Sequence, residues 1–456
     1  MNRITMSFFT GLLWLSSLQL LAQNNPKGAW QVYAQAEEAG FSTEKLEAAK
    51  AQYDKMRSAS LMVVHQGKVL AAWGDVSRRF MNHSMRKSLM SAMYGIYEAE
   101  GKIDLNKTLS QLGIDDLQSL SPEEKGARIL DLITARSGIY HPAAYEPRSM
   151  KKNRPERGAS RPGKKFNYNN WDFNTLLTIL EQEAGIRFFE AFQKRIAKPL
   201  GMEDLRSSDM RYRFESELSK HAAYLFKMST RDLARFGQLY LNEGAWNGKQ
   251  LISKSWVAKS TAAYSTDLGR FSGRGAYGYL WWVDHQSFEQ PAYYASGLGG
   301  HKLYVLPEAD LVIVHRVNSY FNMGVREADL QQLVKLILAA KTGDVKANPK
   351  TRPLKANGPE IKKASVPRST LKQYVGKYSH RFFRELEIYL DGKELRAKGE
   401  VLGNFRLFAQ GNGRFVIEDL PELPMQFEKA SEGKPKGQSV TLENERRIPI
   451  EFVLYY

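Results

Sequence analysis

The sequence predicts an α+β fold, with an antiparallel sheet and a helical lobe, followed by a small all-β barrel domain. Three observations lead to this prediction. The chain has 456 residues, of which 43% are hydrophobic, so it can bury a large core and divide into two domains. Before residue 340, strand patterns enclose a series of helical patterns. After residue 367, short apolar segments recur at a regular spacing.

The elements of the first domain follow from the period of their apolar residues. Ser42 is expected to cap a helix, because apolar residues follow it at helical spacing. The turn Gln66-Gly67 separates two apolar strands, 61–65 and 68–73, and predicts a hairpin. We expect a site in the crevice between the sheet and the helical lobe. Further strands are predicted over 277–283, 302–307 and 311–315, and helices over 84–101, near 173–185, 187–199 and 230–243.

The second domain is predicted from a change of pattern. Residues 341–367 lose apolar periodicity and gain Lys, Pro, Asn and Gly, which is typical of a linker. Short strands then follow at 374–378, 386–390, 405–408, 414–417, 425–427 and 449–454. The predicted organisation is a first domain over residues 28–340, a linker over 341–367 and a C-terminal β-barrel domain over 368–456.

Residues 1–22 have the pattern of a secretory signal peptide. An apolar run over 8–21 ends at Ala22, after which we expect cleavage. The alternative is an uncleaved membrane anchor, but the run is short for a span and is interrupted by Ser16, Ser17 and Gln19. We therefore predict a periplasmic or secreted protein without stable membrane insertion.

Composition excludes several kinds of chemistry. The chain has no cysteine, so disulfides and thiolate nucleophiles are excluded. Its 8 histidines are scattered without a metal-ligand spacing, and we predict no metal and no cofactor. Gly273–Gly278 matches a dinucleotide fingerprint, but it precedes a predicted strand instead of opening a helix.

Basic residues gather just before Tyr168, in a chain with a formal net charge of +17. One interpretation is a loop over the pocket that attracts an anionic substrate, because a cleft of one sign focuses the field. The other is an ordinary solvated loop. Nucleic acid is not expected as a partner, since the run has few aromatics and follows no known binding module. The residues are Arg148, Lys151, Lys152, Arg154, Arg157, Arg161, Lys164 and Lys165.

The start of the helix over 84–101 carries the strongest chemical signal. Lys87 follows Ser84 by three residues, so both lie on one helix face. A lysine with a lowered pKa can take the proton of a serine, which makes a nucleophile without a histidine. The spacing alone is weak, because Ser-x-x-Lys also occurs at Ser42, Ser149, Ser369 and Ser431.

Two later elements distinguish Ser84 from those serines. Phe166–Asn170 places a Tyr-x-Asn before an apolar-periodic helix, and Tyr294–His301 is a strand followed by a glycine turn. The three elements, in this order, resemble the serine β-lactamase and penicillin-binding-protein superfamily. The nearest branch is class C-like and includes esterases, D-aminopeptidases and 6-aminohexanoate-oligomer hydrolases. The resemblance implies a β-lactamase-like first domain and a lipocalin-like barrel.

The resemblance also implies a role for each motif residue. Ser84 would attack a carbonyl carbon to form an acyl-enzyme, and Lys87 would take its proton. Tyr168 would relay that proton to the leaving group. Asn170 would orient Lys87 or the substrate carbonyl. The oxyanion would rest on the backbone N–H groups of Ser84 and Leu298.

The third motif departs from the family pattern. It reads Ala295-Ser296-Gly297, whereas β-lactamases carry Lys-Thr-Gly and many relatives His-x-Gly. The missing cation or imidazole would otherwise pair with a substrate carboxylate. Substrate contacts are predicted for Ser296, Gly297 and His301. The alternative for His301, and for Lys302 beside it, is a structural role in a strand.

We therefore predict a secreted serine hydrolase that cleaves an ester or amide bond of a small substrate. An anionic substrate is favoured if the basic run faces the pocket. A β-lactamase or D-alanyl peptidase is one alternative, which the third motif disfavours. The other is a non-turnover, penicillin-binding-like sensor or binding protein that keeps the fold. The sequence does not indicate an oligomeric state.

Overall fold

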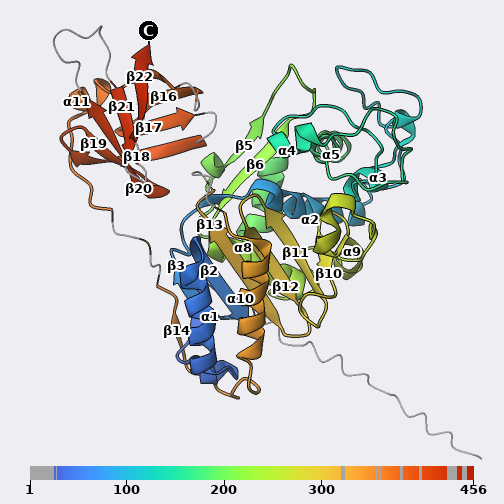
Figure 1. Cartoon of the computed structure of the whole chain (residues 1–456), viewed down its shortest axis with the longest axis horizontal. Coiled ribbons are helices and arrows are strands. Elements are labelled where there is room, and N and C mark those ends of the chain that lie inside the picture. The colour runs from blue at the N-terminus through green and yellow to red at the C-terminus, as the bar shows by residue number, and fades with distance from the viewer. Residues whose placement is uncertain are drawn as a thin grey trace, which may run out of the picture.

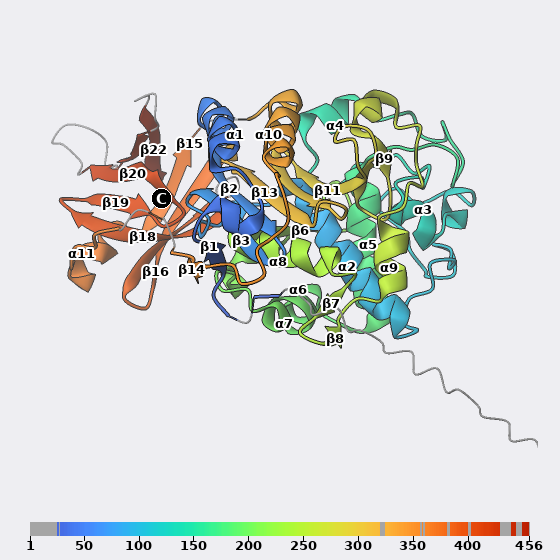
Figure 2. The same ribbon diagram turned by 90° about the horizontal axis from the view of Figure 1, so that it is seen from below.

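The computed structural model describes most of the chain (Figure 1). It covers residues 25–26, 28–319, 324–355, 358, 361–380, 384–399, 403–428, 439–443 and 449–455. The predicted signal peptide lies outside the described residues. Within these ranges, no helix combines the length and the apolar character needed to cross a membrane. Figures 1 and 2 show a large mixed domain with the C-terminal barrel at one end.

A nine-stranded sheet forms the centre of the first domain. Neighbouring strands are antiparallel, except for the parallel pair β1 and β3. This sheet and its helices confirm the predicted α+β class. In spatial order the strands are β14 (Thr351–Pro353), β1 (Gln31–Tyr33), β3 (Lys68–Gly74), β2 (Ser58–His65), β13 (Leu311–Val317), β12 (His301–Leu306), β11 (Ala292–Gly297), β10 (Trp282–Asp284) and β9 (Ala276–Tyr277).

Two parts of this sheet differ from the sequence-based prediction. The single strand expected over 277–283 is two short strands, β9 and β10, which pair with each other. The chain reverses between them because Leu280 has a φ of 64° and the N–H of Gly278 donates to the carbonyl of Trp281 at 2.8 Å. The predicted linker contains β14, which pairs with β1. The outer edge of β1 offers the N–H and C=O groups that such a strand needs.

Helices cover both faces of the sheet. α8 (Thr230–Leu241) packs so closely on one face that a Cβ on Gly237 would lie 2.7 Å from Leu303. α10 (Glu327–Ala339) lies on the other face, where Glu327 pairs with Lys302 at 2.7 Å. Lys302 and Leu303 are adjacent in β12 and so point to opposite faces. α1 (Thr43–Lys55) packs beside α10 (Figure 1).

The helical lobe is built around α2 (Arg86–Ala99), which is buried along most of its length and packs on α5 (Asn170–Ala184). Gly95 allows a close approach to α9 (Lys254–Ser260), because a Cβ there would lie 2.4 Å from the Trp256 indole. A small sheet of β4 (Phe80–Met81), β6 (Ala223–Met228) and β5 (Met210–Arg213) leads the chain into α2. The remaining elements include α3 (Ile129–Ile133), α4 (Arg148–Lys152), α6 (Phe188–Phe192), α7 (Lys198–Leu200), β7 (Ala245–Trp246) and β8 (Lys249–Gln250).

The C-terminal domain is a closed barrel, which confirms the predicted all-β class. α11 (Arg368–Lys372) precedes it. Its core includes Tyr378, Ile388, Phe405, Phe415 and Phe427. β17 has few apolar residues, so the sequence pattern does not reveal it. The strands are β15 (Gly376–His380), β16 (Arg384–Asp391), β17 (Glu394–Gly399), β18 (Gly403–Gly411), β19 (Arg414–Ile417), β20 (Leu420–Glu428), β21 (Ser439–Glu443) and β22 (Pro449–Tyr455).

Candidate active site

Ser84 lies at the junction between β4 and α2. The N–H of Asn82 donates to the carbonyl of Phe226 at 2.8 Å, which ties the end of β4 to β6. His83 has a φ of 47°, so the chain turns sharply into the short helix η2 (His83–Met85). Ser84 stays partly exposed, while Lys87 is buried. The hydroxyl thus stands at the N-terminal end of a helix, whose dipole favours developing negative charge.

Lys87 makes the contact with Ser84 that its spacing predicts. A hydrogen bond of 2.9 Å joins Lys87 Nζ and Ser84 Oγ, and only 1% of Lys87 is exposed. The amine also lies 4.5 Å from the ring centre of Tyr168 and 4.6 Å from that of Phe173. Burial lowers the pKa of Lys87 well below its ordinary value, and the charge of Arg86 lowers it further. The neutral amine, which can accept a proton from Ser84, is therefore more populated.

Arg86 provides a fixed positive charge that the sequence analysis does not single out. Only 1% of Arg86 is exposed, and its Nη1 donates to the carbonyl of His83 at 3.3 Å. Its guanidinium carbon lies 5.0 Å from the ring centre of Tyr224 and 5.4 Å from that of Tyr145. Arg86 is the residue before Lys87, and this position is the one feature of the sequence that could have indicated its role. Its charge disfavours the protonated form of Lys87.

Tyr168 comes from the loop before α5. Asn169 caps this helix, because its side chain accepts the N–H of Asp172 at 2.9 Å. The cap fixes the end of the loop beside α2. The Tyr168 ring is 8% exposed and packs among aromatic residues from α5, η6 (Gly269–Arg274), β9 and β10. These residues are Phe173, Phe271, Tyr277 and Trp282.

The phenol of Tyr168 is held in its protonated form. Burial raises the pKa of Tyr168 above its ordinary value. The side chain of Ser84, as a hydrogen-bond partner, and the positive charges of Arg86 and Arg274 oppose this rise. The structure thus brings Ser84, Lys87 and Tyr168 together, and the phenol is a proton donor that nearby charges help to ionise.

Asn170 makes different contacts from those expected. Its Nδ2 donates to the carbonyl of Tyr145 at 2.5 Å, and its backbone N–H lies 3.2 Å from Met150 Sδ. Its Oδ1 is buried and has no hydrogen-bond partner within the described ranges. No hydrogen bond joins Asn170 and Lys87 in this part of the chain. Asn170 therefore holds the loop at Tyr145, and a contact with a substrate carbonyl stays a prediction.

The third motif lies at the end of β11, next to the nucleophile. A Cβ on Gly297 would lie 2.7 Å from the carbonyl oxygen of Asn82 and 3.4 Å from Met85 Cγ. Glycine is therefore needed here for the close approach of β11 to the chain around Ser84. Leu298 follows in the turn after β11 and is 63% exposed. The predicted oxyanion role of its backbone N–H is compatible with this position and stays a prediction.

Arg274 is a basic residue beside the third motif that the sequence analysis does not assign. Its Nη1 donates to Ser296 Oγ at 3.3 Å, and its carbonyl accepts the hydroxyl of Tyr294 at 3.1 Å. Its guanidinium carbon lies 5.0 Å from the ring centre of Trp282. Within the described ranges it forms no ion pair with a carboxylate. A cation thus stands beside Ser296, although Ala295 occupies the position of the family's lysine.

His301 is buried beside the segment that carries Ser84 and belongs to a hydrogen-bond network there. The sequence predicts a substrate contact, but His301 is 0% exposed. Arg316 Nε donates to its Nδ1 at 2.9 Å, so its Nε2 carries the proton and donates to Ser319 Oγ at 3.1 Å. The same hydroxyl joins His83 Nε2 at 2.7 Å. Burial lowers the pKa of His83 to about 3 and that of His301 well below its ordinary value, so both rings are neutral. A substrate contact is excluded in this arrangement because both ring nitrogens are engaged.

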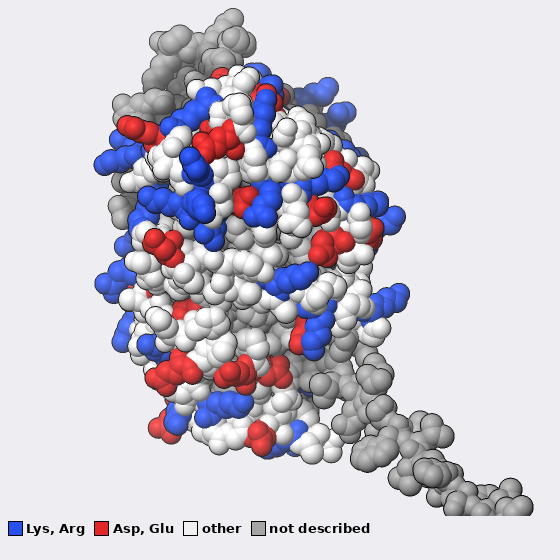
Figure 3. Space-filling view, turned by 90° about the vertical axis from the view of Figure 1, so that its right-hand side faces the viewer, with Lys and Arg blue, Asp and Glu red and all other residues white. Residues whose placement is uncertain are grey.

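The basic run before Tyr168 is partly neutralised. Arg157 pairs with Glu124 at 2.6 Å, Arg161 pairs with Glu123 at 3.0 Å, and Arg154 pairs with Glu146. On the face at the right-hand side of Figure 1, basic and acidic side chains are interspersed (Figure 3). The exposed members of the run without an ion pair in the described chain are Arg148, Lys151, Lys152, Lys164 and Lys165, and attraction of an anionic substrate by them stays a prediction.

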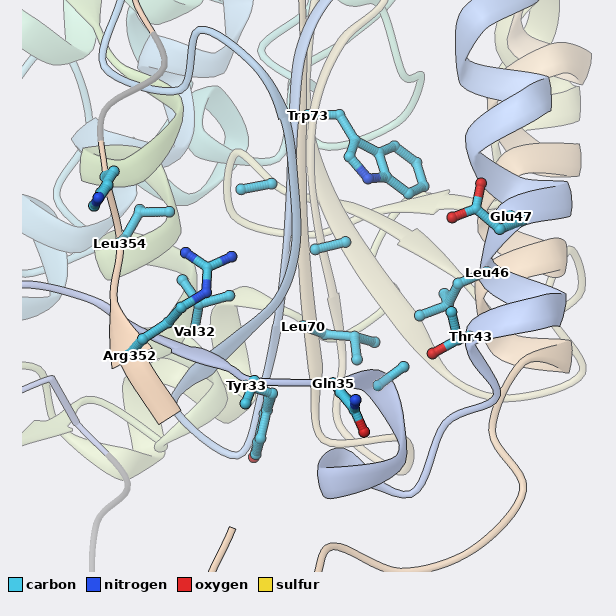
Figure 4. A pocket seen from close by; sticks show the side chains of 15 residues that line it. Val32, Tyr33, Gln35, Thr43, Leu46, Glu47, Leu70, Trp73, Arg352 and Leu354 are labelled. Atoms are coloured by element: carbon cyan, nitrogen blue, oxygen red, sulfur yellow. The ribbon is translucent and has the colours of Figure 1, made fainter. Parts of the chain in front are cut away.

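A groove of about 440 Å³ opens elsewhere on the first domain, between α1 and the strands β1, β3 and β14 (Figure 4). Figure 4 shows Leu46 and Glu47 of α1 on one side and Arg352 and Leu354 on the other. None of the predicted site residues lines it. In the described part of the chain, no group of three or more His, Asp or Glu side chains could hold a metal ion.

Comparisons with known proteins agree with this geometry. A family model described as Beta-lactamase matches residues 44–336. A Bacillus anthracis protein named as a 6-aminohexanoate-dimer hydrolase shares 22% identity, with 68% of this chain and 89% of that chain covered and a TM-score of 0.51. A Bacteroides dorei protein named as a beta-lactamase shares 15% identity, with 66% and 100% covered and a TM-score of 0.50. No curated protein matches.

The sheet, its helical lobe and the Ser84–Lys87 pair define a protein of the β-lactamase and penicillin-binding class. At these identities the two solved structures show the fold alone. The family model covers more than half of the chain, so the chain belongs to the Beta-lactamase family. Members of this family are generally hydrolases, which supports a serine hydrolase of this superfamily.

Proposed function

We propose that this protein is a secreted or periplasmic serine hydrolase that cleaves an ester or amide bond of a small substrate through an acyl-enzyme at Ser84. One observation carries the proposal: the 2.9 Å hydrogen bond between Ser84 Oγ and a buried Lys87 Nζ that also contacts Tyr168. Membership of the Beta-lactamase family supports hydrolysis. Export is supported by the signal-like sequence of residues 1–22.

The proposed acylation step needs a base, an acid and an oxyanion site. Neutral Lys87 accepts the proton of Ser84 while Oγ bonds to the carbonyl carbon. The backbone N–H groups of Ser84 and Leu298 stabilise the oxyanion. Through Tyr168, the proton passes to the leaving oxygen or nitrogen as its bond to the carbonyl carbon breaks. In deacylation a water molecule attacks the acyl-enzyme, and the same groups return the proton to Ser84 as the acid leaves.

An anionic substrate is supported by the charges around this site. Arg274 Nη1 lies 3.3 Å from Ser296 Oγ and has no carboxylate partner among the described residues. A guanidinium can bind a carboxylate with two parallel hydrogen bonds. The contact also favours a second candidate, a β-lactamase or D-alanyl peptidase, because such substrates carry a carboxylate. The sequence alone disfavours that candidate, since Ala295 removes the family's cation.

Covalent labelling tests the proposed function. The purified full-length protein is treated with a serine-reactive fluorophosphonate and, separately, with a fluorescent penicillin, and turnover of a chromogenic short-chain ester is followed. Labelling at Ser84 together with turnover is the expected result. Stable labelling without turnover would indicate the non-turnover sensor. Absence of labelling would contradict a nucleophilic Ser84.

Arg274→Met tests the preference for anionic substrates. We expect kcat/KM for a carboxylate-bearing ester to fall by at least about tenfold relative to its neutral analogue, as for loss of one charge-assisted pair. Arg270→Met is the matched control, because Arg270 stands on the same short helix η6 and its guanidinium lies over Phe271 at 4.9 Å. An equal loss for both esters would contradict carboxylate recognition.

A further inference from the structure

A buried turn of the barrel contacts the first domain. Glu418 and Asp419 join β19 to β20, and Asp419 is only 4% exposed. Asp419 pairs with Lys227 Nζ at 2.5 Å and with Arg79 Nη2 at 3.0 Å. Glu418 pairs with Arg79 at 3.2 Å and with Arg206 at 2.8 Å. Two carboxylates of the barrel therefore neutralise cations of the hydrolase domain.

The charges at this contact are desolvated. Arg79 is 6% exposed, Lys227 4% and Asp209 5%. Asp209 pairs with Arg79 Nε at 3.0 Å but lies 3.9 Å from Lys227 Nζ. Without Asp419, Lys227 would lose its ion-pair partner at 2.5 Å, while Arg79 would keep its pairs with Asp209 and Glu418. Loss of one partner of a buried ion pair is strongly unfavourable, so β6, which carries Lys227, and the segment at Arg79 would have to move or admit water.

The β4 and β6 pair leads directly to the nucleophile. Arg79 immediately precedes β4, and Lys227 of β6 is in register with Met81, the last residue of β4. Ser84 follows three residues later. A second contact shows how tightly this segment is held: Arg316 Nη2 donates to the carbonyls of Phe80 and Met81 at 2.8 and 3.2 Å. The barrel turn thus holds the strand pair from one side, and Arg316 binds its backbone.

We propose that the C-terminal barrel contributes to catalysis by the first domain and that Asp419 is a positioning residue for Ser84. Its carboxylate fixes Arg79 and Lys227, and these fix β4 and β6 in the register that presents the serine hydroxyl to Lys87. An interdomain contact that only held the two domains together could lie on any exposed surface. The aromatic contact of Lys227 Nζ with Phe405 of the barrel, at 4.4 Å from the ring centre, strengthens the same attachment.

This inference rests on the proposed function, and the full-length protein tests it. Asp419→Asn keeps the shape of the side chain and removes its charge. We expect fluorophosphonate labelling of Ser84 and kcat for a neutral ester to fall at least about fivefold, with KM changed less than about twofold, because the nucleophile and not the substrate site is displaced. The pair Asp419→Asn with Lys227→Gln removes one charge of each sign and should restore kcat to within about twofold of wild type.

Controls separate positioning from general damage to the barrel. Asp391→Asn removes a carboxylate that pairs with Arg396 inside the barrel at 2.8 Å and is 59% exposed, and it should leave labelling unchanged. Glu418→Gln is a milder variant of the same turn for use if Asp419→Asn does not fold, and it should slow labelling in the same direction. A folded Asp419→Asn or Glu418→Gln protein with wild-type labelling would overturn the proposal.

Hydrogen exchange distinguishes failure of this inference from failure of the proposed function. Asp419→Asn should speed exchange of the amides over residues 80–90 relative to wild type, whether or not the protein turns over any ester. If wild type is not labelled at Ser84, the hydrolase proposal fails, and faster exchange in the variant would still support positioning of the segment. Unchanged exchange over these residues would overturn it.

Discussion

Replacing Lys87 by methionine tests the proposed base most directly. Methionine keeps an unbranched stem against the rings of Tyr168 and Phe173 and removes the amine 2.9 Å from Ser84 Oγ. That separation lies within the range of about 2.6–3.2 Å that proton transfer requires, so the contribution of a general base should be lost in full. We expect kcat/KM for a short-chain ester to fall by about 10²–10⁴-fold, which corresponds to roughly 3–5 kcal/mol of activation free energy.

The same substitution should not unfold the protein. Lys87 is buried and its pKa is lowered, so the unfolded chain binds a proton that the folded chain binds less well. The stability of the wild type therefore rises with pH between the lowered pKa and the ordinary value of 10.5. Lys87→Met should remove this contribution and be as stable as wild type, or more stable, below that range. Thermal unfolding at several pH values measures the difference.

The assay combines ester hydrolysis with fluorophosphonate labelling of Ser84. Lys45→Met is the matched control, because Lys45 stands in another Ser-x-x-Lys, after Ser42, but is exposed. In wild type the acidic limb of the pH profile of kcat/KM should lie well below 10.5, since the neutral form of Lys87 is the active one. A folded Lys87→Met protein with wild-type turnover would show that another group is the base.

Three further substitutions examine the rest of the site. Tyr168→Phe keeps the ring packing and should slow ester turnover by about 10²-fold or more, because the proton relay is lost; turnover at the wild-type rate would argue against the relay. Gly297→Ala places a Cβ 2.7 Å from the carbonyl oxygen of Asn82, so both labelling and melting temperature should drop, and a fully active, equally stable variant would contradict the close approach. Asp172 is buried with a raised pKa, so native stability should fall as pH rises from 3.8 through that raised pKa. Asp172→Asn should flatten this slope in thermal unfolding, and an unchanged slope would mean that Asp172 is ionised in the native state.

The parts of the site that the sequence predicts are those that depend on local spacing. Ser84 and Lys87 are three residues apart on one turn, and their 2.9 Å contact follows from helix geometry. The prediction of Tyr168 also depended on the order of the motifs, because nothing local brings a tyrosine before a helix to a serine about eighty residues earlier. No spacing or motif in the sequence indicates that Arg274 belongs to the site. Arg274 reaches Ser296 only because the chain turns back between β9 and β10.

The contacts that His301 and Asn170 make in the structure depend on the surroundings of each side chain. The pattern of Tyr294–His301 places His301 near the third motif, but its burial depends on Arg316 and Ser319 from the next strand and the residues after it. Asn170 likewise turns to the carbonyl of Tyr145, which the Tyr-x-Asn pattern does not contain. A motif specifies which groups are available, and the packing around them selects their partners.

On its own, the order of amino acids determined the α+β class, the appended barrel and the serine–lysine pair, because hydrophobic period and neighbour spacing act over a few residues. Tertiary structure decided the split of the strand expected over 277–283, the burial of His301, the cation at Arg274 and the attachment of the barrel at Asp419. Each of these joins segments far apart in the chain. Such contacts form only when the packed sheet and barrel bring the segments together and remove water from between their charges.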